Sequence, residues 1–257
     1  MGMMLTYKVV SVSIPSCMPV RIVHTILITS LFSTSAMLVS QSVVAATSNN
    51  QYQASKYREL GLSYQRQERY PEAITSMKKS VELDPSNLNG RVNLGWTQHL
   101  AGQEDSAAES LWQAAFLHPF SPPTFNALGI VYLVTGDLTA AVLVHTWAAI
   151  LKPNNEIAFY NLSLAYHRLK LYDLAITAAT KAATLEPSNP HPLVALAIAH
   201  WDSDDRIRAQ LAYRKALDLD SRYSDRGFLN YLKEAGFSPE QIKTSQQILA
   251  TSKSFSP

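Results

Sequence analysis

The chain repeats itself with a period of 34 residues. A small residue recurs at this spacing and always follows a leucine. The five small residues are Gly61, Gly95, Gly129, Ser163 and Ala197. A proline ends each of the first four units, at positions Pro85, Pro119, Pro153 and Pro187. This regularity predicts a stack of similar supersecondary elements, because each unit can bury its apolar face only against its neighbours.

Each unit is predicted to be a pair of antiparallel helices. In the third unit, apolar residues recur at helical spacing on one face. These residues are Phe125, Leu128, Tyr132 and Leu133. Gly136 then breaks the first helix, Asp137 can cap the second, and Pro153 ends it, because proline cannot continue the hydrogen-bond ladder. Gly129 lies inside the first helix and is interpreted as a packing residue, since no Gly-Lys-Ser/Thr follows as in a phosphate loop.

The segments YRELGLSY, FNALGIVY and FYNLSLAY share an aromatic residue, a leucine, a small residue and a tyrosine at fixed spacing. This pattern resembles the tetratricopeptide repeat. The second unit departs from it at Arg91 and Gln98, and the fifth at Leu193 and His200. The resemblance divides the chain into the repeats 54–87, 88–121, 122–155, 156–189 and 190–223. It implies an all-α superhelix with a concave groove, and it leaves the function open because such repeats serve many partners.

Residues 224–257 are predicted to form C-terminal capping helices that cover the exposed face of the fifth repeat. One helix is expected from about Arg226 to Ala235. The segment beginning at Ser238 opens the other with a capping box. Residues 47–53 are expected to be a flexible polar lead-in.

Residues 1–46 are predicted to be a signal peptide. The stretch 22–46 contains no charged residue and ends in the small residues Ala45 and Ala46, as before a cleavage site. Signals usually span about 15–30 residues, so the true start is expected at Met18. The protein is therefore expected to be exported to a periplasm, a thylakoid lumen or the extracellular space. The alternative is a membrane anchor formed by residues 22–46.

The distribution of charge argues against a nucleic-acid partner. The formal net charge is +2, and residues 1–46 contain two basic and no acidic residues. The remainder therefore holds 22 − 2 = 20 basic and 20 acidic residues. Nucleic-acid binding needs clustered cations.

The residues that could perform catalysis or bind metal are poorly placed. His99 and His167 share a repeat position but lie two repeats apart, too far for one metal ion. His191 and His200 are nine residues apart, not the three or four of a helical metal pair. The only cysteine, Cys17, precedes the expected cleavage site, so the mature chain would have no thiolate. No catalytic residue, metal or cofactor is predicted.

The resemblance implies that first-helix positions line the concave groove and bind a protein or an extended peptide segment. Those positions hold Arg58, Gln65, Arg66, Trp96, His99, Asn126, Tyr160, His167, Arg168 and Trp201. The same register places Ile130 and Leu133 in the groove. Arginine, tyrosine and tryptophan are favoured at binding hot spots. The alternative is that Arg58 and Arg66 are simply solvated and that Trp96 packs between helices.

The second helices raise the question of an apolar patch on the convex side. Outward positions of the second and third repeats hold Trp112, Phe116, Leu143, Trp147 and Ile150. Monomers rarely expose so large a patch. These residues are therefore either a second interface, for a partner, for self-association or for a membrane surface, or part of the core.

The function that these observations favour is an exported, non-enzymatic scaffold for protein–protein interaction, such as an assembly factor for envelope or membrane complexes. One alternative is a structural protein that self-associates through the convex patch as a homo-oligomer. Another is a protein that binds a glycan or a lipid in its groove.

Overall fold

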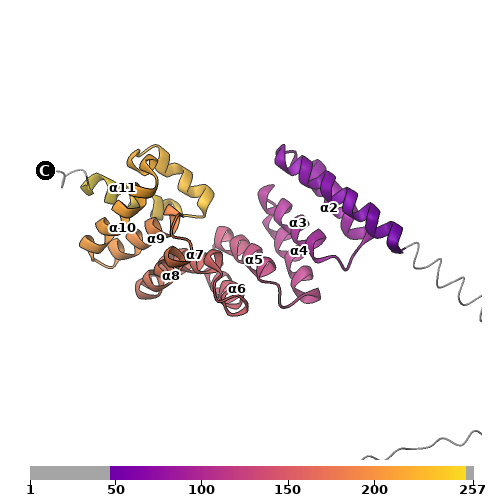
Figure 1. The fold of residues 1–257 in the computed structure, drawn as a ribbon, viewed down its shortest axis with the longest axis horizontal. Coiled ribbons are helices and arrows are strands. Elements are labelled where there is room, and N and C mark those ends of the chain that lie inside the picture. Colours follow the sequence, from indigo (N-terminus) through magenta and orange to yellow (C-terminus); the bar gives the residue numbers. More distant parts are fainter. Residues whose placement is uncertain (1–46, 253–257) are drawn as a thin grey trace, which may run out of the picture. The chain divides into compact units, whose positions relative to one another are not determined.

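The computed structural model describes residues 47–252, and within this range helices are joined by short turns without any strand (Figure 1). Residues 47–66 are helical. The helices that follow in the repeats are α2 (Tyr70–Leu83), α3 (Leu88–Leu100), α4 (Glu104–Leu117), α5 (Pro122–Thr135), α6 (Leu138–Leu151), α7 (Glu156–Arg168), α8 (Tyr172–Leu185), α9 (Pro190–Asp202) and α10 (Arg206–Leu219). The predicted all-α stack of helix pairs is confirmed.

The structure corrects the expectation for residues 47–53 and does not test the one for residues 1–46. Residues 47–53 were expected to be a flexible lead-in but are helical. A nucleated helix gains one backbone hydrogen bond for each residue added, which polar side chains do not prevent. The predicted signal or anchor in residues 1–46 lies outside the described residues. Between residues 47 and 252, no helix has the length and hydropathy that a membrane span requires.

The helices end where the sequence predicts. Helices α2, α4, α6 and α8 each stop two residues before a proline, which disfavours helical backbone in the residue before it. Gly136 ends α5 in the left-handed conformation, with φ of 87°, as its assignment to a turn requires. Asp137 caps α6 by accepting a hydrogen bond of 3.0 Å from the backbone nitrogen of Ala140.

The small residue at the repeated position allows the two helices of a pair to approach closely. A Cβ atom on Gly61 would lie 2.9 Å from Met77, and one on Gly95 would lie 2.6 Å from Leu111. The third repeat has the same arrangement with a different partner, because a Cβ on Gly129 would lie 2.4 Å from His145 Nε2. Gly129 is therefore a packing residue, as predicted.

The first helices of successive repeats form the inner face of the stack. Helices α3, α5, α7 and α9 contact one another in succession, whereas the second helices of the described repeats do not pack on each other to this extent. Closer spacing on one side of a stack produces curvature toward that side. The inner, concave face therefore belongs to the first helices and the outer face to α4, α6, α8 and α10.

The C-terminal segment consists of two 3₁₀ helices, η1 (Ser221–Ser224) and η2 (Phe228–Ala235), and of α11 (Pro239–Ser252). The predicted capping box of α11 is present. The backbone nitrogen of Ser238 donates to Gln241 Oε1 at 2.8 Å, and that of Gln241 donates to Ser238 Oγ at 3.3 Å. The helix expected over residues 226–235 is instead a 3₁₀ helix. A 3₁₀ helix has three residues per turn, so Leu229 and Leu232 lie on the same side of it, and both are buried.

The C-terminal segment also reaches beyond the fifth repeat (Figure 1). The hydroxyl of Tyr160 in α7 donates to the carbonyl of Ala235. The side-chain nitrogen of Gln241 donates to the carbonyl of Leu164 at 3.2 Å. The segment therefore lies across the inner face of the fourth repeat, where the sequence predicted open groove.

Candidate partner-binding groove

Three connected hollows lie along the inner face, and together they are called the inner groove. The first hollow, about 350 Å³, lies between α3, α5 and the start of α7. The second, about 380 Å³, shares Trp96, Ile130 and Ile157 with the first. The third, about 540 Å³, shares Leu133 and Lys233 with the second, among other residues. The groove therefore runs from α3 to α11.

The α3 end of the inner groove is apolar. Trp96 is half-buried, and the centre of its ring lies 5.0 Å from that of His99. A contact of 2.8 Å between His99 Nδ1 and Glu104 Oε2 orients the histidine. Ile130 and Ile157 complete the wall shared by the first two hollows. This end can receive an apolar side chain.

Two asparagines beneath the first hollow satisfy each other. The amide nitrogen of Asn126 donates to Asn155 Oδ1 at 3.1 Å, and the reverse hydrogen bond is 3.0 Å long. Asn155 is 1% exposed and also caps α7 by accepting from the backbone nitrogen of Ala158. This pair holds α5 against α7 and so fixes the floor of the groove.

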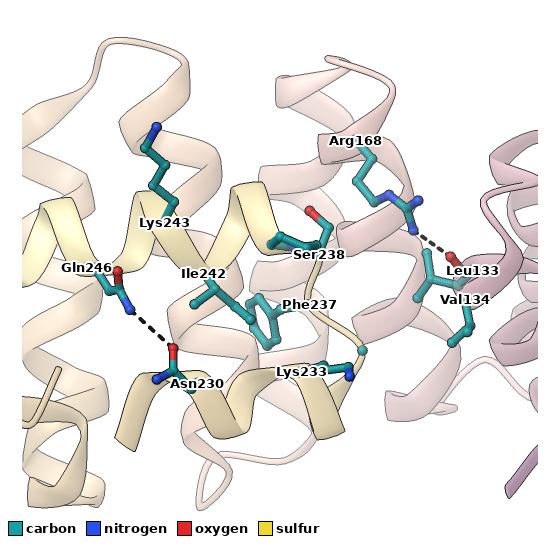
Figure 2. A pocket seen from close by; sticks show the side chains of 12 residues that line it. Leu133, Val134, Arg168, Asn230, Lys233, Phe237, Ser238, Ile242, Lys243 and Gln246 are labelled. Carbon is teal, nitrogen blue, oxygen red and sulfur yellow. Dashed lines mark hydrogen bonds between the residues drawn. The ribbon is translucent and has the colours of Figure 1, made fainter. Parts of the chain in front are cut away.

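The α11 end of the inner groove is cationic. Arg168, Lys233 and Lys243 line the third hollow around Phe237 and Ile242 (Figure 2). Arg168 Nη1 donates to the carbonyl of Leu133, which fixes the guanidinium beside Leu133 in the wall of the hollow (Figure 2). Among the described residues, no Asp or Glu lines this hollow.

The comparisons with known proteins identify the repeats. The tetratricopeptide repeat family matches residues 54–87 and residues 126–190. The chain carries tetratricopeptide repeats. Proteins with these repeats generally bind protein partners and are typically non-enzymatic.

Among proteins similar to this tetratricopeptide repeat chain are two BBSome complex members. One, bbs-4 of Caenorhabditis elegans, is 26% identical over 172 residues, which is 67% of this chain and 37% of that protein. The other, BBS4 of Bos taurus, is 26% identical over 63% of this chain and 31% of its own length. The chain thus spans about a third of these relatives.

A solved structure of MamA protein superposes with a TM-score of 0.59 at 24% identity, covering 67% of this chain and 94% of that one. This likeness concerns the fold alone.

The structure divides the groove residues predicted from the repeats into two groups. Trp96, His99, Asn126, Tyr160 and Arg168 line the inner groove. The three from the first repeat do not line it. Arg58 donates to Asn87 at 3.4 Å, Gln65 accepts from Thr97 at 3.1 Å, and Arg66 is exposed.

The prediction is wrong for His167 and unsupported for Trp201. His167 is 9% exposed. Its Nε2 lies 2.8 Å from Asp202 Oδ2, and its Nδ1 lies 3.2 Å from the side-chain nitrogen of Gln241. The guanidinium carbon of Arg206 lies 4.0 Å from the centre of the Trp201 ring. Trp201 lines none of the three hollows. For His167 the cause is the C-terminal segment, whose Gln241 packs against it on the inner face.

The C-terminal segment also supplies groove residues that the repeat pattern could not reveal. Lys233, Phe237, Ile242 and Lys243 all lie after the last repeat. Their only sequence signal is an amphipathic pattern, which does not tell on which face of the stack a capping segment packs.

The sequence left open whether the apolar residues of the second helices are exposed or part of the core, and the structure exposes four of them together with Phe120. The outer patch consists of Phe116, Phe120, Leu143, Trp147 and Ile150, which are 79%, 76%, 66%, 39% and 61% exposed. Trp147 ties α6 to the end of α4 by donating to the carbonyl of Pro119 at 3.2 Å. Trp112, the fifth candidate for this patch, is half-buried, and its indole donates to the Tyr132 hydroxyl at 2.7 Å.

Proposed function

We propose that this protein is a scaffold that binds an extended segment of another protein in the inner groove. One observation carries the proposal: three hollows connect along the inner face, from the apolar wall at Trp96 to the cations at α11. An extended segment can place successive side chains in successive hollows, whereas a small ligand would fill only one of them.

The groove is built to bind without rearranging. Its walls belong to helices that pack on one another, and the reciprocal Asn126–Asn155 hydrogen bonds fix its floor. A preformed surface avoids much of the ordering cost of association. Trp96, Tyr160 and Arg168 supply the residue types that dominate binding energy at interfaces.

Site-specific photo-crosslinking in the cells that make the protein tests this function. A photo-reactive amino acid replaces Ile130 in the groove or, as the matched control, Thr177 on the exposed side of α8. We expect a defined protein adduct from position 130, reduced by Trp96→Ala, and none from position 177. Equal adducts from both positions, or none from position 130, would contradict groove binding.

The cellular place of this function is proposed from residues 1–46. Their uncharged stretch 22–46 supports export, and an exported scaffold could serve the assembly of envelope or membrane complexes. Intact-mass measurement of the protein purified from its native cells tests export: we expect a chain that begins at Thr47. A chain that retains residues 22–46 would instead support the membrane anchor.

A second candidate function is self-association through the outer patch. If a whole large side chain has a surface of about 150–250 Å², the exposed fractions of the five side chains add up to an area on the order of 600 Å². This approaches the roughly 800 Å² per partner of a stable interface. Helix α6 has no Asp, Glu, Lys or Arg, so two copies could meet without repulsion there. Sedimentation velocity should show a dimer for the wild-type chain and a monomer for the double variant Phe116→Ser with Ile150→Ser. A wild-type chain that stays monomeric at all concentrations would refute self-association.

A further inference from the structure

We propose that the third hollow is an anion site that receives acidic side chains of the bound protein segment. This inference rests on the proposed function and names the chemistry of the partner. Its basis is that Arg168, Lys233 and Lys243, from the three separate elements α7, η2 and α11, all line one hollow at the end of the groove.

Arg168 is a cation that lacks a counter-charge in contact. It is half-buried, it forms no ion pair within the described residues, and burial lowers its pKa. Its hydrogen bond to the Leu133 carbonyl leaves further N–H donors of the guanidinium for another acceptor. A carboxylate can accept two parallel hydrogen bonds from this group and offset its partial desolvation.

The two lysines lie on exposed edges of the same hollow. In Figure 2, Lys243 lies above Phe237 and Lys233 lies below it, so the cations flank an apolar centre. Neither lysine forms an ion pair with any residue between 47 and 252. Both are therefore available to an incoming anion.

The nearby acidic residues do not cancel this charge. Glu234 follows Lys233 in η2 and lines the second hollow. Glu240 acts electrostatically on Arg168 but does not line the third hollow. Counting Glu240 against the three cations leaves an excess of about two positive charges, which favours a ligand with more than one negative charge.

The apolar part of the hollow indicates a protein segment as the source of the anion. Phe237 is 3% exposed, and Ile242 and Val134 also line the hollow. These groups can pack against aliphatic stems below a carboxylate. The hollow also continues into the apolar end of the groove. The partner is therefore a segment with apolar residues at the α3 end and Asp or Glu at the α11 end.

Selection from a displayed library of random 12-residue peptides on the purified full-length chain tests this inference. The charge-reversal variant is Lys233→Glu with Lys243→Glu. The matched control is Lys181→Glu with Lys215→Glu, which reverses two exposed lysines on the outer helices α8 and α10. Trp96→Ala with Ile130→Ala tests the groove itself. All four lysines are exposed, so these changes should leave the fold intact.

We expect the enriched peptides to combine apolar residues with Asp or Glu. Their affinity should fall at least tenfold in the charge-reversal variant, stay unchanged in the matched control, and weaken between 50 and 300 mM salt. Peptides that depend on Trp96 and Ile130 but carry no acidic preference would overturn the anion site and leave the proposed function standing. Peptides that ignore Trp96 and Ile130 would contradict the proposed function.

A separate arm distinguishes a lipid as the source of the anion. Phosphatidylglycerol vesicles are sedimented with the wild-type chain and with the charge-reversal variant. We expect no co-sedimentation of either. Vesicle binding that requires Lys233 and Lys243, without acidic enrichment among the peptides, would overturn the assignment to a protein segment.

Discussion

His145 should make the protein acid-sensitive, and its replacement by leucine should remove that sensitivity. His145 lies on α6, packed against Gly129, at the position where the second repeat has Leu111 against Gly95. It is fully buried, and neither ring nitrogen has a hydrogen-bond partner within the described residues. Burial lowers its pKa from 6.5 to about 3, against an opposing contribution from the Gly129 backbone.

The sign and size of the effect follow from the two pKa values. Below pH 6.5 the unfolded chain binds a proton at this histidine, while the folded chain does not until about pH 3. The folded chain therefore suffers no penalty from His145 protonation above pH 6.5. As the pH falls from 6.5 toward 3, the free energy of unfolding decreases by about 1.4 kcal/mol per pH unit. Between pH 7 and pH 5 the expected loss is about 2 kcal/mol.

Urea unfolding followed by circular dichroism at pH 7, 6 and 5 measures this loss. At pH 7, His145→Leu should already stabilise the chain by about 1–3 kcal/mol, because it removes a buried polar group without a partner. The advantage should grow by about 2 kcal/mol at pH 5. All other titrating groups are common to both proteins and cancel in the difference. An advantage that is the same at all three pH values would refute the reasoning.

Three further predictions concern single contacts. Gly129→Ala should lower the free energy of unfolding by about 1–3 kcal/mol, because the added methyl group overpacks the contact with His145. The loss should be smaller in a His145→Ala background. Equal losses in the two backgrounds, measured by urea unfolding, would contradict the assigned clash. Ser238→Ala removes the cap of α11 and should lower unfolding free energy by about 1 kcal/mol, whereas Ser86→Ala, outside any capping box, should change it little. Tyr160→Phe should accelerate amide hydrogen exchange in η2 by about tenfold, given about 1.4 kcal/mol for a hydrogen bond, and leave α3 unchanged; unaltered exchange in η2 would show that this bond does not hold the segment.

The sequence determines the repeats because their rules are local. The recurrence of a small residue after leucine predicts the close pairs at Gly61, Gly95 and Gly129, and the prolines predict where the second helices end. Both depend on residues within one unit. The register did not decide between core and surface on the outer helices, and only the structure shows that Phe116 and Ile150 are exposed.

The groove was harder to predict because its boundary is set by contacts between distant residues. Tyr160 and Ala235 are 75 residues apart, and Leu164 and Gln241 are 77 apart. No periodic pattern encodes such a pairing, so the C-terminal segment could be expected on the end of the stack but not across the inner face. This is why His167 is buried and why Lys233 lines the groove instead.

The long-range pairing of the C-terminal segment also limits how this array can change in evolution. Tandem repeats usually gain or lose whole units, because each one contacts only its neighbours. Here the fourth repeat holds the attachment points for η2 and α11, through Tyr160 and Leu164. Its deletion alone would leave that segment without its partners, and an insertion after it would move those partners out of reach. We therefore expect changes in repeat number to be tolerated only on the N-terminal side of the fourth repeat.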